Sequence, residues 1–208
     1  MVVAQKVVSK AEGAIVRLDE VTPSPAATRW AAETGRDARL IEVILRESAR
    51  IVRMEQGILI AETRHGFVCA NAGVDASNVA PGIVTLLPQD PDASAHRLRV
   101  ALSTAFGCPV AVIVSDTFGR AWREGVINVA LGVSGLRPLL DYRGSADSYG
   151  RPLTSTVIAL ADELAGAAEI VTRKSAGTPV AIARGVAEWA GEGHGRMLVR
   201  DASRDLFR

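Results

Sequence analysis

The chain has 208 residues, of which 48% are hydrophobic and 23% are charged, and its formal net charge at pH 7 is +1. This composition is typical of a globular protein of one domain or two small ones, and it excludes a disordered chain. The small net charge argues against a protein built mainly to bind nucleic acid or an anionic membrane.

The first half of the chain predicts short strands around one helix. Pro23 and Pro25 mark a loop, and apolar residues at helical spacing predict a helix over residues 37–54. The predicted strands cover residues 2–8, 57–61, 66–70 and 83–87, the second and third of them joined by a hairpin turn. Because the chain opens directly on a strand, we expect a segment upstream of it to be missing.

The second half alternates helices and strands. Pro91 opens a helix that is predicted to run to about Phe106. A second amphipathic helix is predicted over residues 153–171, and buried strands over residues 109–115, 128–133 and 179–183. Several strand pairs are hairpin-like, so the pattern favours a mixed α+β architecture over a doubly wound sheet.

Location follows from what the sequence lacks. No apolar run approaches the ~20 residues that a membrane-spanning helix needs, and the first residues lack the layout of a secretory signal. Cys69 and Cys108 both lie among apolar residues, which favours two buried, reduced thiols over a disulfide. These features predict a cytoplasmic protein without a membrane partner.

Three polar segments interrupt the apolar strands. Residues 7–13 carry Lys10, which could reach a phosphate, although a lysine at a strand end is usually solvated. Residues 71–79 carry Asp75 and Asn78 in a loop, and taken alone this pattern is an ordinary turn. Neither segment identifies a site by itself.

The third segment, residues 114–125, follows directly on an apolar run that predicts a buried strand. Asp116 and Thr117 supply hard oxygen atoms that suit Mg²⁺ or Mn²⁺. Arg120 and Arg123 could neutralise an anionic substrate, and we assign them a catalytic role. The alternative is a capped turn with surface arginines. The sequence contains no Walker A loop and no GxGxxG followed by a helix, which disfavours the common nucleotide-binding folds.

Taken together, four ordered segments carry a family resemblance, and they lie at residues 7–13, 73–79, 115–123 and 177–185. They resemble the coenzyme F-420:L-glutamate ligases (gamma-glutamyl ligases), which use GTP to attach L-glutamate to the deazaflavin coenzyme F-420-0. The resemblance covers nearly the whole chain. It implies that residues 1–208 form one α+β ligase domain, which could be divided into two subdomains. It also implies that two chains form an intertwined homodimer.

The resemblance also implies roles for individual residues. Asp75 and Asp116 match the carboxylates that hold a first divalent cation, Mg²⁺ or Mn²⁺, and Thr117 matches a ligand of a second one. Contacts to GTP are implied for three residues, namely Gln5, Lys10 and Asn78. K⁺ is implied as a further ion, and GTP, L-glutamate and coenzyme F-420-0 are the implied ligands.

Two departures from the family pattern leave alternatives open. Family members carry a nucleotide-binding segment before the first strand, and this chain starts inside that strand. Many members place Gln or Glu at the second cation where this chain has Lys174, and a protonated lysine cannot bind a metal. The alternatives are a non-catalytic remnant that binds nucleotide or deazaflavin, and another metal-dependent phosphotransferase that uses GTP without glutamate.

Overall fold

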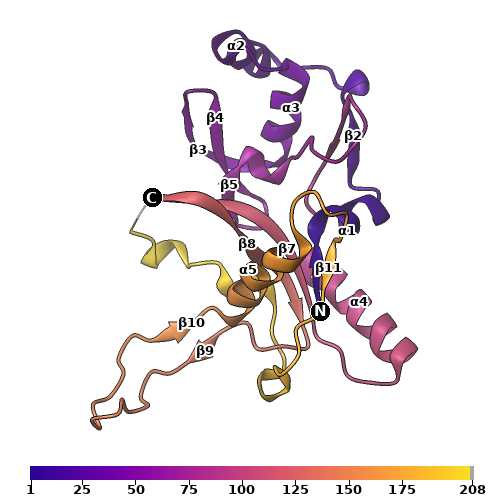
Figure 1. Cartoon of the computed structure of the whole chain (residues 1–208). Helices are drawn as coiled ribbons and strands as arrows, with labels where there is room; N and C mark the ends of the chain where they lie inside the picture. The colour runs from indigo at the N-terminus through magenta and orange to yellow at the C-terminus, as the bar shows by residue number, and fades with distance from the viewer. Residues whose placement is uncertain (207–208) are drawn as a thin grey trace. The chain divides into compact units, whose positions relative to one another are not determined.

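Residues 1–206 are described by a computed structural model (Figure 1), and they form two compact units. The first unit consists of residues 1–4, 90–117 and 127–200. The second consists of residues 5–89, residues 118–126 and the segment that begins at Asp201. Helices occur together with parallel and antiparallel strands, which confirms the predicted α+β class.

A four-stranded mixed sheet forms the centre of the first unit. Its strands, in spatial order, are β11 (Val180–Ala181), β1 (Val2–Ala4), β7 (Val112–Arg120) and β8 (Arg123–Ser134), with the hairpin end of β7 and β8 assigned to the second unit. β1 runs parallel to β7 with Ala4 opposite Ser115, and antiparallel to β11. β1 therefore ends level with the residue that precedes Asp116.

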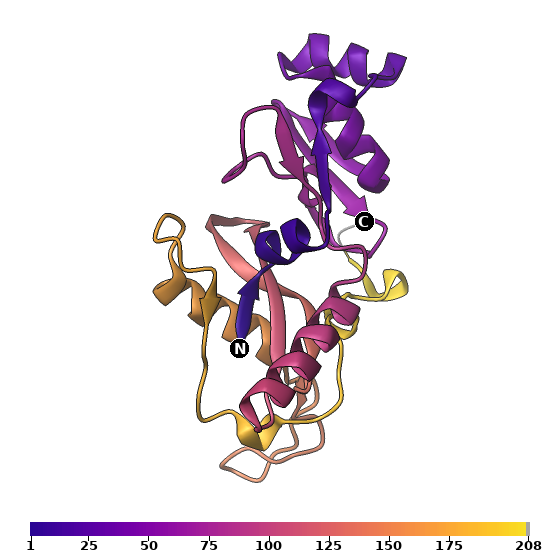
Figure 2. The same ribbon diagram turned by 90° about the vertical axis from the view of Figure 1, so that its right-hand side faces the viewer.

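Helices cover this sheet on both sides (Figures 1 and 2). Helix α5 (Leu160–Thr172) buries Leu160, Ala161 and Ala168 in one apolar cluster with Ile113 of β7. Helix α4 (Pro91–Phe106) lies on the other side and is capped by Asp90, whose carboxylate accepts from the amide of Ala93 at 2.9 Å. The remaining elements of this unit are β9 (Leu140–Asp141), β10 (Val157–Ile158), η3 (Ala187–Trp189) and η4 (Gly195–Leu198).

Among its described residues, the second unit contains two small antiparallel sheets, three α-helices and three short 3-10 helices. One sheet pairs β2 (Ile15–Arg17) with β6 (Ile83–Thr85), and the other has the order β3 (Ser48–Glu55), β4 (Ile58–Thr63) and β5 (Val68–Ala70). The α-helices are α1 (Gln5–Ala11), α2 (Pro25–Thr34) and α3 (Ala38–Glu47), and the short 3-10 helices are η1 (Leu18–Glu20), η2 (Asn71–Gly73) and η5 (Ala202–Arg204). Its core includes Ile44, Leu59 and Val84.

Several predicted boundaries are wrong. The strand predicted over residues 2–8 ends at Ala4 and continues as α1, and the helix predicted over residues 37–54 ends at Glu47 and continues as β3. The helix predicted over residues 153–171 begins only at Leu160. α2 was missed, because Pro25 was interpreted as part of a loop whereas it occupies the first turn of the helix.

The two cysteines differ in their surroundings. Cys69 is buried as predicted, and Cys108 is exposed, so the prediction of a buried thiol at Cys108 is wrong. Within residues 1–206, no helix combines the length and the apolar character that crossing a membrane requires.

Candidate functional site

Five polar residues of the second unit form a connected group, here called the Asp75 cluster: Lys6, Lys10, Asp75, Ser77 and Asn78. The lysines come from α1, and the other residues from the loop between η2 and β6. This loop is fixed at Asp75, whose backbone amide and carbonyl exchange hydrogen bonds with Thr85 of β6 at 3.0 and 2.9 Å. The structure thus brings together three residues that the sequence predicted as ligand contacts.

Lys6 is the centre of the cluster. Its Nζ donates to Asp75 Oδ2 at 2.6 Å, to Ser77 Oγ at 2.6 Å and to the Ser77 carbonyl at 2.7 Å. An ammonium group has three protons, so these contacts use all of them. The Lys6 side chain is 16% exposed and that of Asp75 is 40% exposed, so the ion pair is partly screened by water.

The Asp75 carboxylate remains ionised in this setting. Partial burial, the largest single effect, raises its pKa, but the hydrogen bond and charge of Lys6 and the hydrogen bonds from Ser77 outweigh it and hold the pKa below its ordinary value. Ser77 donates its amide to Oδ1 at 2.6 Å and its hydroxyl to Oδ2 at 3.0 Å. A fixed, charged carboxylate of this kind suits a hard cation such as Mg²⁺ or Mn²⁺.

Lys10 and Gln5 lie on the same helix but in different environments. The Lys10 ammonium is exposed and donates to the carbonyl of Asn78 at 2.6 Å, and Asn78 has a φ of 54°. Gln5 is 1% exposed; its Oε1 accepts from the Ser9 hydroxyl at 2.8 Å, while its Nε2 is buried and lacks a hydrogen-bond partner among the described residues. A buried amide donor without an acceptor is uncommon and indicates a position where a ligand atom could bind.

Four residues of the first unit form a second group, here called the Thr117 cluster: Thr117, Asn128, Glu169 and Lys174. Thr117 Oγ1 donates to Asn128 Oδ1 at 2.7 Å and accepts a hydrogen bond from Lys174 Nζ. Asn128 Nδ2 donates in turn to Glu169 Oε2 at 2.8 Å. Asn128, on β8, is 8% exposed, so these contacts fix Thr117 from the side of the sheet that α5 covers.

Asp116 precedes Thr117 in β7 and is half-buried. Successive side chains of a strand point to opposite faces, so Asp116 lies on the face opposite to that of Thr117. The predicted site residues are thus divided between the two units, with Asp116 and Thr117 in the first and Asp75, Asn78, Lys10 and Gln5 in the second. A shared cation between Asp75 and Asp116 stays a prediction.

The two arginines lie at the hairpin end of β7 and β8, where the strands continue further than predicted and Asp116 is not in a loop. Both are exposed. Arg120 Nη2 donates to the carbonyl of Glu124 at 2.5 Å, so the Arg120 guanidinium stabilises the turn between β7 and β8. Their predicted contact with a phosphate or carboxylate stays a prediction.

Sequence reasoning missed four members of these clusters, namely Lys6, Ser77, Asn128 and Glu169. Lys6 was assigned to a strand, and the signal that could have identified it is helical spacing, since Lys6 and Lys10 are four residues apart on one side of α1. Asn128 and Glu169 were interpreted only as parts of a strand and a helix. Their contact with each other spans 41 residues, which a single sequence does not reveal.

The donor set fits one hard cation better than two. Within the described part of the chain, no three His, Cys, Asp or Glu side chains gather in a group that could hold a metal. Magnesium commonly binds through one or two carboxylates and completes its coordination with water and substrate phosphates, so the charged Asp75 carboxylate, considered within its own unit, fits such a cation. Thr117 fits less well, because its oxygen already accepts from the Lys174 ammonium.

Comparison with known proteins identifies the family. The family profile described as F420-0:Gamma-glutamyl ligase matches residues 1–185. The coenzyme F420:L-glutamate ligase of Methanopyrus kandleri is 50% identical over 213 residues, covering 100% of this chain and 84% of that protein. The proteins of the same description from Methanothermobacter thermautotrophicus and Methanocaldococcus jannaschii are 48% and 43% identical, with the same coverage. The chain therefore belongs to the F420-0:gamma-glutamyl ligase family.

Proposed function

We propose that this chain is a GTP-dependent ligase that joins L-glutamate to coenzyme F420-0 through an amide bond. The observation that carries the proposal is the 50% identity over the whole chain to a coenzyme F420:L-glutamate ligase. The Asp75 cluster, together with Gln5 of the same helix α1, supports it, because two lysines, a carboxylate and a buried amide donor without a partner among the described residues suit a nucleotide and its cation.

The reaction has two steps. A carboxylate oxygen of the coenzyme attacks the γ-phosphorus of GTP, and the bond to the β–γ bridging oxygen breaks, which gives an acyl phosphate and GDP. The amine of glutamate then attacks the acyl carbon, phosphate leaves, and the nitrogen loses a proton. All reacting groups are anions or lone-pair donors, so the protein must offset their repulsion and align them.

The chain's own residues supply part of this positive charge. Lys10 is exposed and held by the Asn78 carbonyl, so its remaining protons can reach a phosphate. Gln5 offers its buried Nε2 to an acceptor of the nucleotide. Lys6 stays with Asp75 and fixes the orientation of that carboxylate.

A divalent cation, Mg²⁺ or Mn²⁺, would be held by Asp75 and Asp116 and would neutralise charge that develops on the phosphates. K⁺ remains part of the proposal as an accessory ion. Arg120 and Arg123 are proposed to contact a phosphate or the glutamate carboxylate, and their exposure leaves them accessible for that role.

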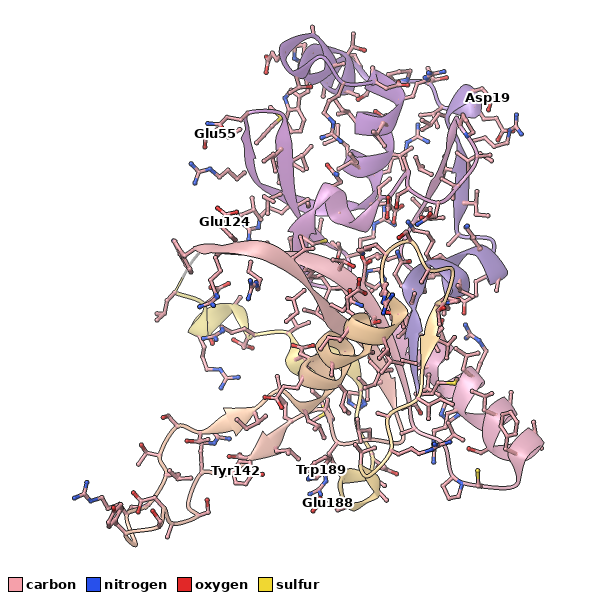
Figure 3. All side chains as sticks on the ribbon, in the orientation of Figure 1. Asp19, Glu55, Glu124, Tyr142, Glu188 and Trp189 are labelled. Atoms are coloured by element: carbon pink, nitrogen blue, oxygen red, sulfur yellow. The ribbon has the colours of Figure 1, made fainter. Side chains whose placement is uncertain are left out.

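The homodimer implied by the family resemblance is also part of the proposal. It is supported by apolar side chains on the segment between β9 and β10, where Tyr149 is 88% exposed and Tyr142 is 42% exposed. Figure 3 labels Tyr142 on this segment, which extends away from the sheet of its own unit.

The test is an amide-forming assay followed by mass spectrometry, with GTP, Mn²⁺, L-glutamate and coenzyme F420-0. Asp116→Ala should lower kcat by about a hundredfold or more, because a cation that stabilises phosphoryl transfer contributes several kcal/mol. Glu188→Ala is the matched control, because Glu188 is an exposed acid on η3 (Figure 3), and it should retain wild-type turnover.

Three outcomes would contradict parts of the proposal. Unchanged turnover of Asp116→Ala would remove the cation role of Asp116. Binding of guanine nucleotide by the wild-type chain without glutamate-dependent product would favour the non-catalytic alternative, and GTP consumption without glutamate incorporation would favour another phosphotransferase.

A further inference from the structure

The hydrogen bonds of the Thr117 cluster run in one direction. Lys174 donates to Thr117, Thr117 donates to Asn128, and Asn128 donates to the carboxylate of Glu169. A hydroxyl group has one proton and two lone pairs. The Thr117 proton is committed to Asn128, and one of its lone pairs is occupied by an ammonium group.

These contacts disfavour the binding of a second metal ion at Thr117. A divalent cation bound to Thr117 Oγ1 would lie about 2.1 Å from that oxygen, and the Lys174 ammonium on the same atom would repel it. The side chain hydrogen-bonded directly to Thr117 on β8 is the neutral carboxamide of Asn128, and Glu169 lies one residue further along the chain of contacts. The immediate surroundings of Thr117 therefore contain a built-in cation and a neutral acceptor.

The backbone holds Lys174 in this position. Helix α5 ends at Thr172, and Arg173 has φ 54° and ψ 154°, a conformation that residues other than glycine rarely adopt. The Arg173 amide donates to the Glu169 carbonyl at 3.0 Å, and the Glu169 side chain accepts from Asn128. Glu169 thus holds two groups in place. Its carbonyl fixes the turn at Arg173 that precedes Lys174, and its side chain fixes the Asn128 amide that contacts Thr117.

We propose that the Lys174 ammonium takes the place of a second divalent cation beside Thr117, so that each active site holds one divalent cation and one permanent organic cation. The proposal rests on the proposed function. Lys174 is exposed, and its contact with Thr117 uses one of its three protons, so two N–H groups remain for an anionic oxygen of a ligand. The ligand class is a nucleotide phosphate or a carboxylate in contact with Thr117.

The experiment counts bound Mn²⁺ per chain. Free Mn²⁺ is measured by electron paramagnetic resonance during titration of the full chain, which is saturated with the imido analogue of GTP. We expect one Mn²⁺ in the wild-type chain, one in Lys174→Arg, which keeps the charge, and two in Lys174→Gln, which replaces it with an amide oxygen. Lys174→Gln combined with Thr117→Val should return the count to one, since it removes the hydroxyl oxygen.

Circular dichroism melting curves establish that each variant is folded before its titration. Two Mn²⁺ in the wild-type chain would overturn the inference while leaving the proposed function intact. One Mn²⁺ in a folded, nucleotide-saturated Lys174→Gln would also overturn it, because removal of the ammonium would not have opened a site. If the wild-type chain did not bind the GTP analogue, the proposed function would fail and the inference with it, and the nucleotide titration distinguishes this case.

Discussion

Lys6→Met tests whether Lys6 holds the Asp75 cluster together. Methionine keeps most of the apolar side chain of lysine and removes the three donated hydrogen bonds to Asp75 and Ser77. Hydrogen bonds to a charged group contribute about 1.5–3 kcal/mol each. Because the Asp75 side chain is 40% exposed, water replaces part of each contact, and we take about 1 kcal/mol per bond.

The expected loss in the free energy of unfolding is therefore about 3 kcal/mol, or roughly 6–12 °C in melting temperature for a chain of this size. Lys10→Met is the matched control on the same helix, since it removes a single exposed contact to a carbonyl and should cost less than about 1 kcal/mol. Urea unfolding followed by circular dichroism measures both. Equal stabilities of the two variants would refute the reasoning.

Lys6→Met also allows a second measurement, of the effect of Mn²⁺ on the melting temperature. Loss of the Lys6 charge leaves the Asp75 carboxylate without its cation, so added Mn²⁺ should raise the melting temperature of Lys6→Met more than that of the wild-type chain. An equal or smaller rise would contradict the proposed cation role of Asp75.

Two further predictions concern stability in the first unit. In Gly132→Ala the new Cβ would lie 2.0 Å from the Pro91 carbonyl oxygen, so α4 must shift. We expect the free energy of unfolding, measured in urea, to fall by about 3 kcal/mol. The control is Gly119→Ala, where the new Cβ meets no atom within 4 Å and the loss should be less than about 0.5 kcal/mol. Burial raises the pKa of Asp162 above its ordinary value of 3.8, despite the hydrogen bond from the Ala130 amide. The folded state therefore binds the Asp162 proton more tightly than the unfolded state, and the contribution of Asp162 to the free energy of unfolding falls as the pH rises above 3.8. Asp162→Asn should therefore be at least as stable as the wild-type chain at pH 7, and melting curves should lose this difference below about pH 4; a difference that does not change with pH would contradict the assignment.

The sequence predicted elements that have strong local signals. α4 was placed correctly because a proline opens it and a glycine ends it, and the pair β4 and β5 because a turn separates two short apolar runs. The family resemblance, which rests on ordered segments spread over the chain, predicted the α+β class and the family that the profile match shows.

The wrong boundaries have a common physical cause, because short apolar runs fit a helix or a strand equally well and distant partners decide between them. Ile51 and Val52 continue the helical spacing of α3, yet β3 pairs with β4 along its length, with two register shifts. Val7 and Val8 extend the apolar run of β1, yet Gln5, Val8 and Ser9 are buried on one side of α1. These choices are made by tertiary contacts.

The Lys6–Asp75 contact and the Lys174–Thr117 contact differ in whether the oxygen-bearing side chain can still bind a metal ion. The Asp75 carboxylate has about four lone-pair positions, and its Oδ1 accepts a single hydrogen bond, from Ser77, among the contacts described above. A divalent cation can therefore bind Oδ1 while Lys6 remains on Oδ2. The Thr117 hydroxyl is neutral, has donated its proton to Asn128 and shares its oxygen with Lys174. A cation is thus compatible with Lys6 beside a carboxylate but not with Lys174 beside a hydroxyl, so we expect substitution of Lys174, and not of Lys6, to change the number of bound metal ions.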